Sequence, residues 1–342
     1  MSTARHFGRT AVSKSLRGLK VRRMASIRSS LPHTERTAAE PRENQLEPVV
    51  LSHIRAVNDT IRVIRLKAVD EQHTIKFTIR DDRLHMIDIL LVLTCPRRPG
   101  QWLDTFVPGV RQAGGFTITS TPQDAMPSSH SSPYLELAIQ RSSNPPAQFL
   151  WRDTEEIIGS QLTVRVGGSF TWPTPHLDTK QIDRLVLIAG GVGINPLISI
   201  FSYLIRIPAP LRPPEIHFVY STKAETDLDP QRILFLPRLM DLVAAAADPA
   251  NVTLSCFLTG VGDDDYIEHG KLPNRTFARR IADHDILKAL DGYKPSVFGA
   301  EHDRKNTVCY VCGPAQFTDA QVHFVRSQAG MSEDRVLLEK WW

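Results

Sequence analysis

The chain has 342 residues, with 42% hydrophobic and 23% charged side chains and a formal net charge of +4. This length is enough for two domains, each with its own hydrophobic core. The positive charge is concentrated in residues 1–34, where eight Lys and Arg side chains precede the first acid, Glu35. Because the remainder is close to neutral or slightly acidic, the charge excludes a protein that binds nucleic acid over its whole surface.

The first residues have the composition of a targeting segment. They are rich in Arg and Ser and show no periodic pattern. This composition is typical of a mitochondrial transit peptide, so we expect residues 1–47 to be cleaved or disordered and the protein to be mitochondrial. A disordered basic tail is the alternative, and an arm for nucleic acid or an anionic membrane is least favoured. No apolar run approaches the roughly 20 residues of a membrane-spanning helix, so we expect no transmembrane segment. We also expect no nucleic-acid partner.

Residues 49–172 predict short strands with little helix. Turn residues separate the strands, and a loop rich in Pro and Ser at 121–133 interrupts them. This pattern is typical of a small antiparallel barrel or sandwich. The expected strands cover residues 61–68, 75–79, 86–93, 115–119, 134–139 and 161–166.

Beyond a joint at residues 172–183, strands and helices alternate. The alternation predicts a doubly wound parallel α/β sheet with right-handed crossovers. We therefore expect a barrel domain at 48–178 and an α/β domain at 179–342. The expected strands cover 185–189, 215–220, 252–258, 307–312 and 336–339. The expected helices cover 197–206, 234–246, 277–281 with 285–290, and 317–329. The stretch 260–305 is read as a partly helical insertion.

A glycine-rich turn follows the first strand of the α/β domain. Residues 185–189 form an apolar run typical of a strand buried on both faces, and three of residues 190–193 are glycine. Glycines let backbone N–H groups reach the surface, Asn195 can cap the next helix, and Pro196 suits its first position. Strand, turn and helix N-terminus favour a phosphate or diphosphate site at the sheet's carboxyl edge. The alternative is a tight turn in an ordinary α/β domain.

The cysteines and histidines give no sign of a metal or disulfide framework. Four cysteines are too few for a disulfide scaffold, and the histidines lack ligand spacing. Cys309 and Cys312 lie three residues apart on an expected strand, so their thiols should face opposite sides of the sheet. This placement excludes a dithiol pair, and no metal site is expected.

Six motifs stand in the order of one known superfamily. They are a Pro-Gly-Gln turn, a strand ending in Phe-Thr-Ile-Thr-Ser, an Asn-Pro-Pro-Ala turn, a Gly-Gly-Ser-Phe turn, a Cys-Gly-Pro motif and an aromatic C-terminus. They occupy residues 99–101 with 108–109, 115–122, 144–150, 166–170, 312–317 and 339–342. The set resembles the ferredoxin–NADP reductase superfamily. The runs 189–196, 144–147 and 339–342 are similar to the mitochondrial oxidoreductase NAD-binding domain-containing protein family.

The resemblance implies an all-β antiparallel FAD-binding barrel followed by an NAD(P)-binding α/β domain. It also implies that hydride passes from NAD(P)H to bound FAD and on to an unidentified acceptor. The residues implied in catalysis are Thr117, Cys312 and Trp342. Those implied in binding FAD are Phe116, Thr117, Ser120, Asn144, Pro145, Pro146, Ala147, Trp341 and Trp342. Those implied in binding the dinucleotide are Gly190, Gly191, Val192, Gly193, Ile194, Asn195, Pro196, Cys312, Gly313 and Pro314. The alternatives are that Cys312 is a small buried hydrophobe and that the tryptophans only cover the joint.

One departure from the superfamily concerns the flavin diphosphate. The arginine that grips it aligns with Gly114, and a contact of that kind contributes roughly 1.5–3 kcal/mol. Arg111, Arg141 or Arg152 could substitute. Phe116 replaces the tyrosine that stacks on the flavin, and Thr117 keeps a hydroxyl near its reactive nitrogen. This departure motivates an alternative function, a nucleotide-binding sensor or assembly factor without turnover.

The choice between NAD and NADP depends on the end of the second α/β strand. Ser221 and Lys223 could meet a 2′-phosphate, whereas an acid there would accept hydrogen bonds from a free ribose. Glu225 and Asp227 lie slightly beyond. Lys223 could equally be a solvated loop charge, and we favour NAD because the nearer family is named for it.

Overall fold

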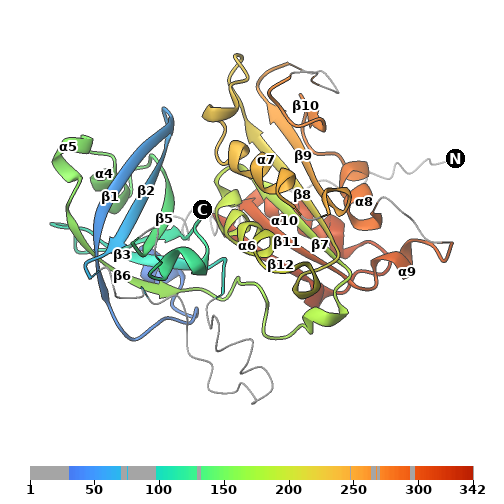
Figure 1. The fold of residues 1–342 in the computed structure, drawn as a ribbon, viewed down its shortest axis with the longest axis horizontal. Coiled ribbons are helices and arrows are strands. Elements are labelled where there is room, and N and C mark those ends of the chain that lie inside the picture. The colour runs from blue at the N-terminus through green and yellow to red at the C-terminus, as the bar shows by residue number, and fades with distance from the viewer. Residues whose placement is uncertain are drawn as a thin grey trace, which may run out of the picture.

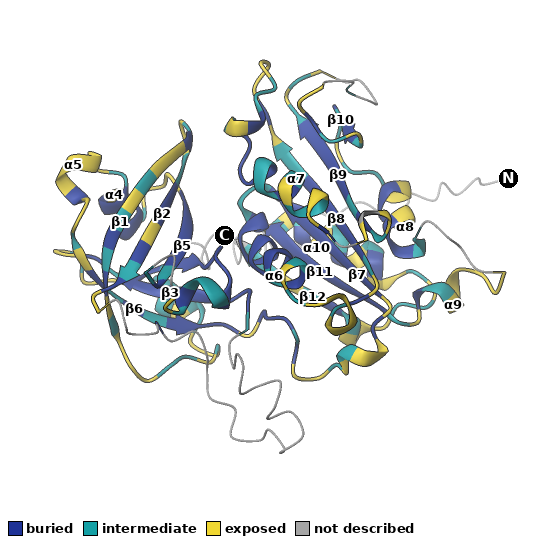
Figure 2. Cartoon of the chain, in the orientation of Figure 1, coloured by how far each residue is buried: buried dark blue, intermediate teal, exposed yellow. Residues whose placement is uncertain are grey.

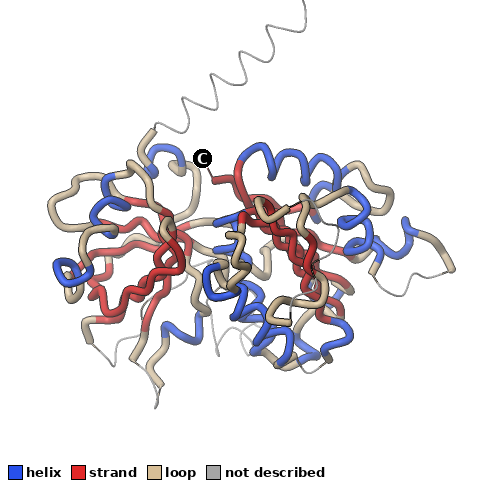
Figure 3. The backbone as a smooth tube through the Cα atoms, turned by 90° about the horizontal axis from the view of Figure 1, so that it is seen from above, coloured by secondary structure: helices blue, strands red, loops and turns tan. Residues whose placement is uncertain are grey.

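The computed structural model describes residues 31–70, 75, 98–128, 132–246, 248–262, 267, 270–292 and 297–341. Two six-stranded sheets follow one another along the chain and lie side by side (Figure 1). The first sheet is antiparallel and the second is parallel, which confirms the predicted fold class. Seen after a 90° turn, most of the helices surround the second sheet (Figure 3).

The antiparallel sheet has the strand order β4-β3-β6-β1-β2-β5. A bridge between Ile118 and Leu137 joins its two edges, so the sheet curves into a barrel. Buried leucines such as Leu51 and Leu103 fill its core. The strands are β1 (Glu47–Asn58), β2 (Ile61–Ala68), β3 (Trp102–Phe106), β4 (Gly114–Thr117), β5 (Tyr134–Gln140) and β6 (Gln161–Gly167), and the short helices after β5 are α4 (Pro145–Leu150) and α5 (Thr154–Ile157).

Two barrel strands were not predicted. Strand β1 is 12 residues long, but Pro48 and the polar His53 and Arg55 obscure its alternation. Strand β3 is buried at its first four positions, so polar Asp104 and Thr105 hide it from a hydrophobic pattern. The predicted strands at 75–79 and 86–93 fall outside the described residues, except for Ile75.

The parallel sheet has the strand order β10-β9-β8-β7-β11-β12. Helices α6 and α7 supply side chains to the core on one face, and α8 and α10 to the core on the other. The strands are β7 (Arg184–Gly190), β8 (Glu215–Lys223), β9 (Val252–Thr259), β10 (Thr276–Phe277), β11 (Thr307–Pro314) and β12 (Val336–Trp341). The helices are α6 (Ile194–Arg206), α7 (Leu236–Ala244), α8 (Asp283–Asp291), α9 (Ala300–Arg304) and α10 (Ala315–Arg326). The helix predicted at 277–281 is wrong, because Thr276 and Phe277 pair with β9 as a strand.

Strand β11 alternates between the two cores of the α/β domain. Cys312 packs in the core beneath α6, and Cys309 packs in the core beneath α8 and α10. The two thiols therefore lie on opposite faces, as predicted. Burial raises the pKa of the Cys309 thiol, so this thiol stays protonated and chemically inert at neutral pH.

The barrel and the α/β domain share one apolar core. Val63, Ala138 and Trp172 from the barrel side pack in the same cluster as the strands beneath α6 and α7. The Tyr310 hydroxyl donates to the carbonyl of Thr171 at 2.8 Å. Buried residues consequently run from the second sheet into the junction (Figure 2).

Residues 31–46, which we call the N-terminal arm, lie against the barrel. Within the arm, α2 (His33–Arg36) places the His33 ring edge-on to Trp102, with ring centroids 4.6 Å apart. The arm's Arg42 donates to buried Asp104 at 3.0 Å. The expected disorder is therefore wrong for these residues, because a buried carboxylate and an aromatic ring hold them.

Asp104 is the centre of that contact. His33, Arg42 and Arg165 all lie within 3.2 Å of its oxygens. Burial alone would raise the pKa of Asp104, but hydrogen bonds from His33 and Arg165 and the charge of Arg42 lower it overall.

Within the described part of the chain, no helix is long and apolar enough to span a membrane.

Candidate functional site

The glycine turn at the carboxyl end of β7 is tightly fitted to its neighbour β11. A Cβ added at Gly193 would lie 2.3 Å from the carbonyl oxygen of Cys312, so only glycine fits there. Gly191 has a φ of +53° and nothing within 4 Å of an added Cβ, so its outer side is open. The predicted dinucleotide residues on β7, on α6 and in the Cys-Gly-Pro motif therefore come together.

A phenylalanine ring forms the floor beside this turn. Added Cβ atoms at Gly190 and Gly313 would lie 2.8 and 2.7 Å from the Phe317 ring. The two glycines let the parallel strands and the start of α10 approach closely. The ring keeps the backbone of both strand ends in place without a polar side chain.

The N-cap of helix α6 lies two residues before the predicted one. Gly193 is the N-cap, whereas Asn195 is the second helical residue and Pro196 the third. Asn195 does not cap the helix, because its Nδ2 donates to the carbonyl of Ala138 on β5 at 3.2 Å. Its Oδ1 is buried without a hydrogen-bond partner in the described structure. Asn195 thus joins the helix to the barrel and keeps a free acceptor at the junction.

Cys312 contributes its backbone, not its thiol, to this site. The side chain is fully buried in the core beneath α6, while its carbonyl faces Gly193. Of the neighbouring motif residues, Gly313 is buried and Pro314 is exposed. This geometry favours the small buried hydrophobe for Cys312, and its catalytic role stays a prediction.

The end of β8 places the predicted ribose residues near the turn. Ser221 is in register with Gly190, and Lys223 lies two residues further and is exposed. Among the nearby acids, Glu225 accepts from Arg232 at 2.7 Å. Ser221 therefore belongs to the site by position, whereas Glu225 already has a cationic partner.

On the barrel side, the space at the predicted flavin diphosphate is filled. A Cβ added at Gly114 would lie 2.5 Å from the Phe116 ring and 2.7 Å from Cβ of Pro146. Phe116 is only 8% exposed and packs in the barrel core. Gly114 therefore lacks both the family arginine and the space for one.

The turn at 144–147 offers few hydrogen-bond donors. Asn144 is the N-cap of α4, and Pro145 and Pro146 are its first two residues. Proline has no N–H, so two of the donors that a helix N-terminus usually leaves free are missing. Ala147 is next and is buried.

The arginines near α4 are engaged with aromatic rings. The guanidinium carbons of Arg62 and Arg141 lie 4.6 and 5.4 Å from the centre of the Trp151 ring. Arg152 lies over Phe149 at 5.1 Å. The two substitutes proposed near this turn, Arg141 and Arg152, therefore have their cationic faces on rings, and Arg111 is exposed.

Thr117 and Ser120 are both buried, and Ser120 contacts the α/β domain. The Ser120 hydroxyl accepts from the N–H of Glu136 at 3.0 Å, and its carbonyl accepts from Ser199 of α6 at 2.7 Å. Thr117 is fully buried, and its Oγ1 has no hydrogen-bond partner among the described residues. Ser120 is thus occupied by protein contacts, whereas Thr117 keeps an unused hydroxyl.

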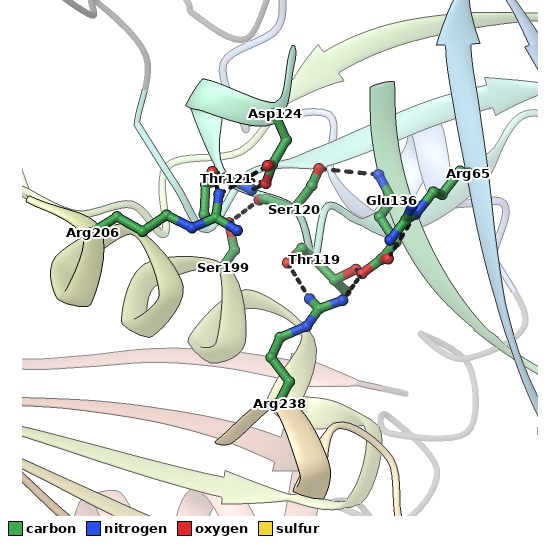
Figure 4. Close-up of polar contacts among 9 residues, drawn as sticks. All are labelled: Arg65, Thr119, Ser120, Thr121, Asp124, Glu136, Ser199, Arg206 and Arg238. Carbon is green, nitrogen blue, oxygen red and sulfur yellow. Dashed lines mark hydrogen bonds and ion pairs between the residues drawn. The ribbon is translucent and has the colours of Figure 1, made fainter. Parts of the chain in front are cut away.

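Two arginines of the α/β domain reach across to the barrel (Figure 4). Arg206 donates to Thr121 and Asp124, each at 2.8 Å. Arg238 pairs with Glu136 and donates to the carbonyl of Thr119 at 3.2 Å. We call these contacts the interdomain latch, which sequence analysis missed because its members lie up to 119 residues apart.

The latch borders a polar pocket of about 190 Å³. Burial alone would raise the pKa of Asp124, but Arg206 and hydrogen bonds from Thr121 lower it overall. The pocket is also lined by Ser202, whose buried Oγ has no partner in the described structure. The latch keeps α6 and α7 against β5 and against the segment 119–124 that follows β4.

The C-terminal strand runs alongside the Cys-Gly-Pro motif. Trp341 pairs through its backbone with Pro314, and its side chain and all of Trp342 lie outside the described structure. Burial and the carboxylate of Glu40 raise the pKa of Glu339 to about 8. Because Glu40 belongs to the N-terminal arm and accepts from Ser169, the arm and the last strand meet at the junction.

These observations test the fit of FAD. The unused hydroxyl of Thr117 and the Oδ1 of Asn195 are polar groups that suit a flavin ring. The diphosphate position, with Gly114 covered and α4 starting in two prolines, does not suit FAD held as the resemblance implies. The α/β half fits a dinucleotide, and the barrel half does not fit a gripped diphosphate.

Comparison with known proteins agrees with this two-domain arrangement. Residues 182–325 match the ferric reductase NAD binding domain. Over 315 residues the chain is 30% identical to oxidoreductase NAD-binding domain-containing protein 1 of Danio rerio, covering 91% of this chain and 97% of that protein. The chain belongs to the oxidoreductase NAD-binding domain-containing protein 1 family.

Solved structures place this family member in the ferredoxin reductase-like fold. The cytochrome b5 reductase domain of Ulva prolifera nitrate reductase is 16% identical with a TM-score of 0.55, covering 86% of this chain and 97% of that one. A ferredoxin NADP+ reductase from Neisseria gonorrhoeae, with bound FAD and NADP, is 12% identical with a TM-score of 0.55, covering 87% and 99%. At these identities the likeness shows the fold, an FAD-type barrel followed by an NAD-binding domain.

Proposed function

We propose that this protein is an NAD(P)H-dependent oxidoreductase that passes hydride to a flavin and from there to a separate acceptor. The observation that carries the proposal is the glycine turn, open at Gly191 and fitted against Cys312 and Gly313. The turn leads into the 13-residue helix α6, whose N-terminus favours an anion. The match to an NAD-binding domain and the FAD and NADP bound to the Neisseria gonorrhoeae reductase support the same reaction.

The residues divide the work between binding and placement. The backbone N–H groups of the turn would hold the dinucleotide diphosphate, and Gly313 would border the nicotinamide. Thr117 and Asn195 would meet the polar edge of the flavin from the barrel side and from α6. Trp341 and Trp342 would cover its face, as the resemblance implies.

Binding of the dinucleotide is tested with Gly191→Asp. The carboxylate would lie where the diphosphate is expected, so NADH binding measured by calorimetry should weaken at least about tenfold. Gly159→Asp is the matched control, because Gly159 also has a positive φ and open surroundings but lies in the barrel. Equal binding by the two variants would place the dinucleotide elsewhere.

We propose NAD as the preferred dinucleotide and the mitochondrion as the compartment. NADH has no 2′-phosphate for the exposed Lys223 to contact. Lys223→Ala should therefore leave the Kd for NADH within about twofold of the natural chain. Two results together would reverse this preference. The natural chain would bind NADPH more tightly than NADH, and Lys223→Ala would lose much of its NADPH affinity. The compartment is tested by imaging a fluorescent fusion with and without residues 1–30.

A second candidate is a nucleotide-binding sensor or assembly factor without turnover. It is favoured by Gly114, which lacks an arginine to hold a flavin diphosphate and is covered by the Phe116 ring and Pro146. Anaerobic spectra separate the two functions. Loss of the absorption of added flavin when NADH is supplied supports the oxidoreductase. Binding of NADH without reduction of flavin or of any dye supports the sensor.

A further inference from the structure

The feature behind this inference is the filled space at Gly114 and the start of α4. We propose that the chain holds flavin without any grip on a diphosphate, so that FAD, FMN and riboflavin are interchangeable, dissociable substrates. The inference rests on the proposed function, since it specifies the flavin that the oxidoreductase would reduce. In the balanced reaction, NAD(P)H gives two electrons and one hydrogen as hydride, solvent gives one proton, and NAD(P)+ and reduced flavin leave.

The first support is steric. The ring of Phe116 lies over Gly114, at 2.5 Å from where a Cβ would be, and Pro146 closes the other side at 2.7 Å. All three residues are buried. A phosphate group would therefore meet a hydrocarbon surface at this position, where burial of its charge is unfavourable.

The second support is the loss of donors at α4. Its first two residues, Pro145 and Pro146, have no N–H, and the Asn144 side chain makes no capping hydrogen bond. The helix has only six residues, so its dipole is small. The start of α4 therefore offers fewer backbone donors to a diphosphate than a helix N-terminus without prolines.

The third support is the state of the nearby cations. Arg62 and Arg141 lie on Trp151, and Arg62 also donates to the carbonyl of Arg152 at 2.7 Å. Moving either arginine to a phosphate would give up its cation–π contact. Of the substitutes that the sequence offered, Arg141 and Arg152 thus lie on aromatic rings beside α4, and Arg111 is exposed.

The groups that keep free hydrogen-bonding capacity serve all flavins alike. Thr117 Oγ1 in β4 and Asn195 Oδ1 in α6 are buried and have no hydrogen-bond partner in the described structure. The ring system is common to riboflavin, FMN and FAD. Lack of a single charge-assisted phosphate contact removes about ten- to a hundredfold of the affinity that would otherwise distinguish FAD.

The test is a fluorescence titration of the full chain with riboflavin, FMN and FAD in turn. We expect the three Kd values to agree within about threefold, and flavin to be lost on gel filtration. FAD binding more than about tenfold tighter than riboflavin would overturn this inference and leave the proposed function standing. Binding of none of the three, with NADH still bound, would overturn both.

Arg141→Ala and Arg111→Ala each test a remaining route to a grip on the diphosphate. If the inference holds, neither variant changes the ratio of the FAD and riboflavin Kd values. A selective loss of FAD affinity in Arg141→Ala would show that this arginine leaves Trp151 for the diphosphate, which contradicts the proposal. Circular dichroism of both variants verifies that the barrel is intact.

Discussion

Two turns of this molecule precede helices at the two positions where the sequence predicted a diphosphate, one in the α/β domain and one in the barrel domain. The turn after β7 is open at Gly191 and precedes a helix of 13 residues. The turn before α4 has two prolines and precedes a helix of six residues, with Gly114 covered from both sides. The barrel motif thus stands at its expected place in the order of motifs, although it lacks the hydrogen-bond donors and the open space that the glycine turn after β7 has.

The largest expected effect is at Gly193, in the open turn. Gly193→Ala would press a Cβ against the backbone of Cys312, which cannot rotate away. We expect the free energy of unfolding to fall by about 3 kcal/mol and dinucleotide binding to be lost. Urea denaturation and calorimetry measure both. Gly191→Ala, which has space and only the cost of positive φ, should lose about 1–2 kcal/mol; equal losses would refute the tight fit.

The second effect concerns the interdomain latch that closes the barrel side. Arg238→Gln would leave buried Glu136 paired with Arg65 alone, so we expect a loss of about 1–3 kcal/mol and faster hydrogen exchange at residues 117–120. Arg232→Gln, which breaks a largely exposed pair with Glu225, is the control and should change stability by less than about 1 kcal/mol. Unchanged hydrogen exchange in Arg238→Gln would mean that the latch does not hold residues 117–120 in place.

The third effect tests the filled turn directly. Gly114→Ala would overlap the Phe116 ring and Pro146, and we expect a loss of about 1–2 kcal/mol in urea denaturation. Adding Phe116→Leu should recover part of it, because the smaller side chain frees space. A Gly114→Ala variant as stable as the natural chain would show that a longer side chain has room there.

The smallest effect lies where the arm meets the last strand. The pKa of Glu339 is raised to about 8 by burial and Glu40. The folded state therefore retains a proton that the unfolded state loses near pH 4.5, so stability should fall as pH rises from about 4.5 to about 8. The full shift would correspond to roughly 5 kcal/mol, but Glu339 is only partly buried, so we expect a much smaller effect. Glu339→Gln should flatten this slope and be more stable than the natural chain at pH 8. An unchanged slope would mean that Glu339 is ionised in the folded protein.

Sequence patterns predicted the α/β half better than the barrel half. The run 185–193 fixes a buried strand and a turn by local rules alone, and β7 with its glycine turn lies within one residue of the expected bounds. Strand β3 was missed because its polar Asp104 is buried by His33 and Arg42, which are distant in sequence. Strand β1 was missed because Pro48 and the exposed His53 and Arg55 obscure its alternation.

The candidate site shows the same limit. Absence of an arginine at position 114 is readable from the sequence, but the Phe116 ring and Pro146 over that position are not, because strand and helix meet only in three dimensions. The latch joins Arg206 to Asp124 across 82 residues, and no local pattern marks it. The cap predicted at Asn195 was wrong because a tertiary contact to Ala138 captured its amide.

The apolar cluster that runs from the barrel into the α/β domain has a consequence for how the molecule unfolds. A fragment of residues 182–325 would lack Val63, Ala138 and Trp172, which pack against its core in the whole protein. Without them, the ring of Tyr310 would be exposed to water. The two halves should therefore melt in a single calorimetric transition, with coincident loss of barrel and helix signals. Excision of the nucleotide-binding half should yield an aggregating fragment and not an autonomous module.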